Sequence, residues 1–227
     1  MNFRYIILIT SICLIITSNC HKNDNVENNE IPAAVSDSIL YIDLVPDLVL
    51  RCTLDTVIDN YGNKLIKGEF GYRLDINNDS ISDFLLVGRQ WGEIGQRSFS
   101  DSAYIEGLNS SAFIGYKIPF GNCWCPCNSA TILEGGKIDK NLSDGWVQRV
   151  LIHATNKGLD CSWHYYGEER QYLAVWLHVN NEINYGWIGA SGFSRTKVGD
   201  YYVMEFVIYD FAINLRNGKS ICAGQKK

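Results

Sequence analysis

Short runs of β-forming residues, separated by turn residues, recur along most of this chain and limit what it can fold into. Residues 172–179 are rich in branched and aromatic side chains and stop at Asn180-Asn181. Apolar residues alternate with polar or small residues over positions 70–76, as in a strand with one buried face. No segment carries a sustained apolar stripe with the period of about 3.6 residues that an amphipathic helix needs.

Other segments extend this pattern. Further runs of the same kind are residues 39–45, 48–54, 83–87, 185–188 and 201–209, with Pro46-Asp47 predicted as a turn between the first two. Residues 141–152 fit either a short helix or another strand. Many short strands and 20 Gly predict an all-β fold, a single jelly-roll-like β-sandwich over residues 37–227. No linker divides that span, which is long enough for one core.

The first 20 residues have the features of an export signal. A short start that carries Arg4 precedes an apolar run, residues 5–16, and then Thr17-Ser18-Asn19-Cys20. The run is shorter than the roughly 20 residues that span a bilayer, and its layout is that of a signal peptide. The final Cys resembles the lipobox of bacterial lipoproteins, where the Cys is diacylated and becomes the mature N-terminus. We therefore predict a signal peptide over residues 1–19 and lipidation at Cys20; the alternative is an ordinary signal followed by an incidental Cys.

The next segment, residues 20–36, is polar, Asn-rich and partly acidic. It cannot bury apolar surface, so we expect a disordered, lipidated tether. Its acidic residues resemble the surface-export signals of some Gram-negative lipoproteins. The whole chain has a net charge of −5, export would remove only Arg4 among its charged residues, and no basic run is present. Nucleic acid is therefore not an expected partner.

The most distinctive local pattern is an acidic loop. Oxygen-bearing side chains recur at alternate places, with Asp75, Asn77 and Asp79 followed by Asp83 at position nine, and the Ile81 carbonyl falls at position seven. Calcium takes six to eight hard oxygen ligands, and a chain that curls round the ion offers alternate side chains and a carbonyl. The three carboxylates would repel one another without a cation. The pattern predicts a structural Ca²⁺ site.

Two departures separate this loop from the helix–loop–helix calcium site. Ser80 stands where that motif has Gly, and Leu86 stands where it has a bidentate Glu. The expected flanks are strands. The loop instead looks like the Asp-x-Asn-x-Asp-x-x-x-Asp loops found between strands of many secreted proteins. The alternative is a hairpin loop whose Asp and Asn side chains cap their own backbone.

Six cysteines remain beyond Cys13 and Cys20. An exported protein with an even number of cysteines is expected to form disulfides, although the sequence does not choose among the 15 pairings. The candidates are Cys52, Cys123, Cys125, Cys127, Cys161 and Cys222. The alternative for the Cys-Trp-Cys-Pro-Cys run over positions 123–127 is a soft thiolate site for Zn²⁺ or Cu(I).

Aromatic residues are abundant, with 6 Trp and 13 Tyr. Trp163, Tyr165, Tyr166 and Trp187 are candidates for stacking on sugars, with packing in the core as the alternative. No local nucleophile signature is present, so no catalytic residue is assigned.

Two stretches together resemble a loose group of uncharacterised exported β-sandwich lipoproteins of Bacteroidetes-type bacteria. The first runs from Tyr-Ile-Asp-Leu-Val-Pro-Asp at positions 41–47 through the acidic loop, and the second from Tyr-Gly-Trp at 185–187 to Ala-Gly-Gln at 223–225. Group members tend to have Asp-Gly where this chain has Asp79-Ser80. The resemblance covers residues 39–87 and 172–225 and implies an envelope location and a bound Ca²⁺, but no activity.

These observations predict a non-enzymatic lipoprotein of the bacterial outer membrane, facing the periplasm or the surface. Its role would be binding or structural, with a glycan or an envelope protein as partner besides the membrane. The alternative is a glycan-capturing accessory protein or a glycan-active enzyme, which would need two carboxylates facing each other across a cleft.

Overall fold

The computed structural model describes most of the predicted domain. The described residues are 38–93, 99–117, 128–129, 131–142, 145–156, 159–160, 170–191, 194–198 and 201–227. The predicted signal peptide over residues 1–19, the tether over residues 20–36 and the lipidation site Cys20 lie outside these ranges. Within them, the chain forms strands and no helix.

The described residues form seventeen strands. Those of the first half are β1 (Ile39–Arg51), β2 (Thr53–Ile58), β3 (Lys64–Leu74), β4 (Phe84–Glu93), β5 (Phe99–Gly107), β6 (Ala112–Lys117), β7 (Asn128–Ser129) and β8 (Thr131–Ile132). Those of the second half are β9 (Lys137–Ile138), β10 (Gly145–Val147), β11 (Arg149–Asn156), β12 (Leu159–Asp160), β13 (Gln171–Val179), β14 (Glu182–Ala190), β15 (Ser194–Val198), β16 (Tyr201–Asn214) and β17 (Ile221–Cys222).

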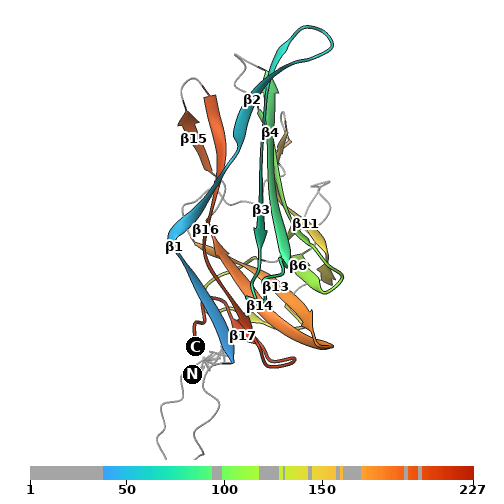
Figure 1. Cartoon of the computed structure of the whole chain (residues 1–227), viewed down its shortest axis with the longest axis vertical. Helices are drawn as coiled ribbons and strands as arrows, with labels where there is room; N and C mark the ends of the chain where they lie inside the picture. The colour runs from blue at the N-terminus through green and yellow to red at the C-terminus, as the bar shows by residue number, and fades with distance from the viewer. Residues whose placement is uncertain are drawn as a thin grey trace, which may run out of the picture.

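The strands form an almost entirely antiparallel sandwich, which confirms the predicted all-β class. The hydrogen-bonded order is β1-β16-β14-β13-β6-β7-β11-β5-β4-β3-β2, and a small ribbon, β17-β9, stands apart. The first and last strands of this order are consecutive in the chain, because β1 passes into β2 at Cys52. The chain therefore crosses from one layer, β1-β16-β14-β13, to the other, β2-β3-β4-β5-β11, and the two layers face each other (Figure 1).

Hairpin chemistry explains several of these pairings. Asn180 and Asn181 both have positive φ, 53° and 63°, as a two-residue turn between twisted strands requires. They join β13 to β14, so the predicted strand ends where the Asn pair indicated. The alternation over residues 70–76 is also confirmed, since Leu74 and Ile76 are buried whereas Gly71 and Arg73 are exposed.

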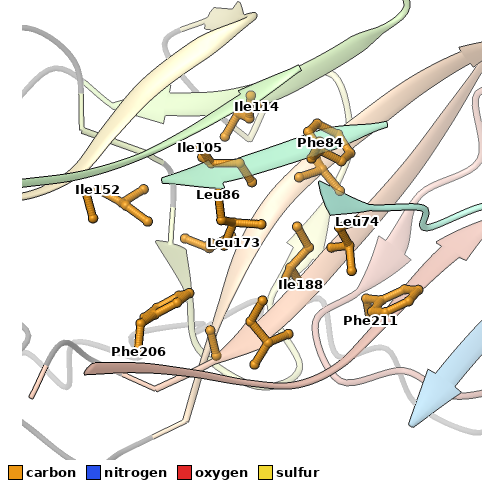
Figure 2. Close-up of a cluster of buried hydrophobic side chains, with 14 of the residues drawn as sticks. Leu74, Phe84, Leu86, Ile105, Ile114, Ile152, Leu173, Ile188, Phe206 and Phe211 are labelled. Carbon is orange, nitrogen blue, oxygen red and sulfur yellow. The ribbon is translucent and has the colours of Figure 1, made fainter. Parts of the chain in front are cut away.

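The main core lies between the two layers. It is built from the side chains that point inward, which are those of every second residue along each strand. Figure 2 shows side chains from both layers that point toward one another, among them Leu86 and Ile105 from one layer and Ile188 and Phe206 from the other. A second, smaller core lies on the face of β13, β14 and β16 that points away from the main core. There Trp187 packs with residues of the β17-β9 ribbon, such as Ile138 and Ile221.

The structure decides two predictions that concerned single segments. The predicted turn at Pro46-Asp47 is wrong: β1 runs through it, because both of its halves pair with β16, and the register shifts between Asp43 and Leu48. Pro46 has no N–H to donate, and such a bulge tolerates it. In the segment 141–152, which fitted a helix or a strand, residues 145–147 form β10 and residues 149–152 lie at the start of β11.

The two layers separate toward one end of the molecule. β1 begins at the lower end, beside the C-terminus, whereas the β2–β3 turn and the β15–β16 pair stand at the upper end (Figure 1). Where β1 leaves β16, the Cys52 amide still donates to the Met204 carbonyl oxygen, at 3.2 Å. Beyond that point Gln90 of β4, which is 1% exposed, reaches across from the facing layer. Its Oε1 accepts from the Met204 amide (3.0 Å) and its Nε2 donates to the Tyr202 carbonyl oxygen (2.6 Å).

Candidate functional site

A cleft lies between the two layers at their open end. Its volume is about 450 Å³, within the range of small-molecule sites. The lining comes from β1, β2, β3, β15, β16 and the residue between β1 and β2: Arg51, Cys52, Leu54, Asp55, Thr56, Ile66, Val198 and Val203. The cleft exists because β1 pairs with β16 and its continuation β2 pairs with β3.

The cleft combines apolar walls with a few polar groups. Leu54, Ile66 and Val203 supply apolar surface. The Arg51 guanidinium forms an ion pair with Glu205 (Nε to Oε2, 2.5 Å). Glu205 also accepts from the Thr196 hydroxyl at 3.2 Å, so its carboxylate is held between two strands. Such an arrangement suits a ligand with an apolar body and a polar end.

Cys52 is a free thiol in this wall, which corrects its assignment as a disulfide candidate. The residue is 4% exposed and sits where β1 becomes β2, packed in the main core. Burial, with smaller contributions from the charges of Asp101 and Glu69, raises the pKa of the Cys52 thiol to about 12. The group is therefore protonated at neutral pH and is a poor nucleophile.

Large apolar side chains around the open end are exposed. Ile58 and Tyr61 of the β2–β3 hairpin are 68% and 90% exposed, and Val198 and Tyr202 of the β15–β16 hairpin are 51% and 48% exposed. Of these residues, Val198 also lines the cleft.

The acidic loop joins β3 to β4, and its side chains form hydrogen bonds within the loop. The Asp75 carboxylate accepts from the amides of Asp79 (3.3 Å) and Ser80 (2.7 Å). The Asp79 carboxylate accepts from the Ile81 amide (2.8 Å) and from the Asn77 side-chain amide (2.9 Å). Asn78 and Ser80 have positive φ. These are the hydrogen bonds of a loop that caps its own backbone, which was the alternative to a calcium site.

Asp83 behaves differently from the other loop acids because it is buried. It is 4% exposed, and its carboxylate accepts from the Ile76 amide at 2.9 Å. Burial raises the pKa of Asp83 to about 6, and the charges of Asp75 and Asp79 add to this effect. No group of three His, Cys, Asp or Glu side chains within the described ranges is arranged to hold a metal ion. The donor chemistry of the loop suits calcium, but this conformation does not assemble the set.

A buried carboxylate lies on the face of the first layer that points away from the second layer. Asp210 of β16 is 0% exposed; it forms an ion pair with Arg170 and accepts from the Tyr41 hydroxyl at 2.9 Å. Lys226 lies 3.9 Å from Asp210 Oδ2 and 4.6 Å from the centre of the Tyr41 ring. The cluster ties the C-terminal tail to the first strand of the domain, and we read it as structural.

The remaining residues that were predicted to bind a ligand or to form disulfides have different outcomes. Trp187 is 0% exposed and packs against Tyr41 and Tyr172, with ring centroids 6.1 and 5.1 Å apart. It cannot stack on a sugar, so its assignment as a ligand-binding residue is wrong; a strand position inside a β-rich run gave no sign of which face it would take. Trp163, Tyr165, Tyr166, Cys123, Cys125, Cys127 and Cys161 lie outside the described residues. Cys222 is disulfide-bonded.

Sequence reasoning missed the cleft residues. Arg51, Asp55 and Val203 come from three strands and form no local motif. The sequence carried a weak signal, because the predicted run over residues 48–54 passes through Cys52 without a turn residue.

Comparisons with known proteins identified no relative of this chain. Scans against models of protein families, curated proteins and solved structures found no match. Within the described part of the chain, no helix has the length and apolar character needed to cross a membrane.

Proposed function

We propose that this chain is a lipoprotein of the bacterial outer membrane, anchored through Cys20, whose β-sandwich has a non-enzymatic binding role. The observation that supports a binding role best is the cleft of about 450 Å³ at the open end of the sandwich. Its ligand would have an apolar body and a polar end, to match the apolar walls and the polar lining residues such as Arg51.

The arrangement of the domain agrees with attachment through its N-terminus. β1 begins at the end opposite the β2–β3 turn and the β15–β16 pair (Figure 1), and β2, β15 and β16 all contribute residues to the cleft. A flexible tether over residues 20–36 would have a root-mean-square length of about 23 Å. An anchor at the start of the tether would hold the end of the domain where β1 begins toward the bilayer. The cleft would then face away from the bilayer.

Calcium is a secondary part of the proposal. The buried Asp83 carboxylate, whose pKa is raised partly by Asp75 and Asp79, is a place where a bound cation would relieve repulsion. The ion would stabilise the β3–β4 connection and would not take part in chemistry. Binding requires the Asp75 and Asp79 side chains to exchange backbone hydrogen bonds for the ion.

The glycan-active alternative finds less support at the cleft. Among its described lining residues, a single carboxyl group is present, that of Asp55, whereas glycoside hydrolysis uses two.

The anchor is tested by substituting Cys20→Ala in the full chain in its native host. We expect wild-type protein to sediment with membranes and to carry an acylated Cys20 in its N-terminal peptide. The variant should lose both properties, while Cys52→Ala, which removes a cysteine from the domain, should still be acylated. A wild-type N-terminus at Met1, or an unmodified Cys20, would remove the basis of the proposal.

A further inference from the structure

Strand β2 has a partner on only one of its two edges. Within the described ranges it pairs with β3 alone and ends the main sheet. Five of its six residues are exposed, and its pairs with β3 run without a register shift. The other edge of β2, which we call the free edge, is therefore a regular row of peptide groups with no strand beside it among the described residues.

Two hydrogen bonds show which peptide groups point to the free edge. At the β2–β3 turn the Asp59 amide donates to the Asn63 carbonyl oxygen, at 3.0 Å, and bonded and non-bonded residues alternate in an antiparallel ladder. Just before β2, the Cys52 amide donates away from β3, to β16. Both bonds indicate the same alternation. The N–H and C=O groups that point away from β3 are those of every second residue: Leu54, Thr56 and Ile58.

The free edge borders the cleft. Leu54 and Thr56 both line the cleft, and Ile66 and Val203 supply apolar wall. β16 also loses a neighbour here, because β1 pairs with it no further than Arg51. Beyond that point a side-chain carboxamide from β4 bonds to β16 instead, with the same kinds of donor and acceptor as a peptide group. The cleft therefore lies where the ladder between β1 and β16 is interrupted.

β2 lacks the features that keep strand edges from pairing. Natural proteins protect exposed edges with Lys, Pro or a bulge. β1, at the other end of the sheet, has Pro46 and a register shift, and β15 carries Arg195 and Lys197. β2 reads Thr-Leu-Asp-Thr-Val-Ile, so Asp55 is its single charged residue and it has neither Lys nor Pro. An unprotected edge beside a cleft suits a site that accepts a strand.

We propose that the cleft binds an extended polypeptide segment of another protein, which adds a strand to the free edge of β2. The backbone of the segment bonds to the peptide groups of Leu54, Thr56 and Ile58, and every second side chain points to the apolar wall. The inference rests on the proposed binding role of the cleft and names the class of its ligand. A compact apolar ligand would cover these peptide groups without bonding to them, which costs affinity.

Fluorescence anisotropy of a labelled peptide, titrated with the full mature chain over residues 20–227, tests this. The probe is acetyl-Lys-Val-Thr-Val-Thr-Val-Lys-amide, whose apolar and polar side chains alternate as in a strand with one buried face. We expect saturable binding. The same peptide with its five central residues N-methylated should bind at least about tenfold more weakly, because methylation removes the donors that a ladder needs.

Two variants at the centre of the free edge separate recognition of the backbone from recognition of the side chain. Thr56→Pro removes an N–H that does not serve the ladder with β3, so the protein should keep a melting temperature near that of wild type. It should bind the probe about tenfold more weakly. The matched control, Thr56→Val, keeps the N–H and nearly the same shape, and it should bind like wild type.

Several results would overturn the proposal. They are no binding of the probe, equal binding of the methylated peptide, unchanged binding by a folded Thr56→Pro variant, or equal losses in Thr56→Pro and Thr56→Val. Anilinonaphthalene sulfonate, a compact probe with an apolar body and an anionic end, separates this failure from failure of the proposed function. If it binds, and Arg51→Gln weakens it, while the peptide does not bind, the cleft keeps its binding role without the strand. If neither probe binds, both proposals fail.

Discussion

Replacing Gln90 with Leu tests how the open end of the sandwich is held together. The Gln90 amide forms two hydrogen bonds across the layers, to the Met204 amide and the Tyr202 carbonyl oxygen. It thus occupies the place on β16 that β1 vacates after Cys52. Leu has a similar size but leaves both peptide groups without this partner.

The expected loss follows from the burial of these groups. An unsatisfied buried peptide group costs about 1–3 kcal/mol, and the Tyr202 carbonyl is partly reached by water. We therefore expect Gln90→Leu to lower the free energy of unfolding by about 3 kcal/mol. For a domain of this size, about 2–4 °C of melting temperature corresponds to each kcal/mol, which gives a fall of about 6–12 °C.

Urea unfolding followed by tryptophan fluorescence, with a thermal melt by circular dichroism, measures both quantities. The matched control is Arg89→Gln, the adjacent residue on the exposed side of β4, which should change stability by less than about 0.5 kcal/mol. If Gln90→Leu matches that control, or is more stable than wild type, the amide does not stand in for a strand and the reasoning fails.

Three further predictions concern the buried acid, the ion and the free thiol. Because folding raises the pKa of Asp83 to about 6 from 3.8, the folded state binds this proton more tightly, so stability should rise as pH falls from 7 to 4, by at most about 3 kcal/mol. Asp83→Asn should remove that part of the pH dependence, and an identical pH profile in wild type and variant would contradict the assignment. In calcium buffer at pH 7, EDTA should lower the melting temperature of wild type, and Asp79→Ala should abolish the difference; indifference of wild type to EDTA would argue against a bound ion. Cys52, with its pKa raised to about 12, should resist an aromatic disulfide reagent in the native protein and react in urea, as peptide mapping would show. Rapid native labelling would mean that the wall at Cys52 opens.

The fold class and several hairpins were predictable because their signals are local. Alternation over residues 70–76 determines which side chains β3 buries, and the Asn180-Asn181 pair determines where the chain reverses. Both follow from backbone sterics and the two-residue period of a strand. The acidic loop was located in the same way, at the correct hairpin, although its side chains bond to their own backbone.

Other features depended on long-range pairing. Whether Pro46 marks a turn or a bulge depends on the pairing of both flanks with β16, about 160 residues away. Trp187 and Trp91 both lie in strands, yet Trp187 is buried under the β17-β9 ribbon and Trp91 is exposed on β4. Alternation assigns residues to two faces but does not say which elements cover each face.

Local sequence patterns were enough to predict that this chain forms short strands and where several of them turn. Long-range strand pairing placed β1 and β2 in different layers. The cleft at the open end, the burial of Cys52 and the contact of Gln90 with β16 all follow from that placement. Turn preferences and periodicity act over a few residues, whereas a cleft between layers forms only when strands distant in sequence pair with one another.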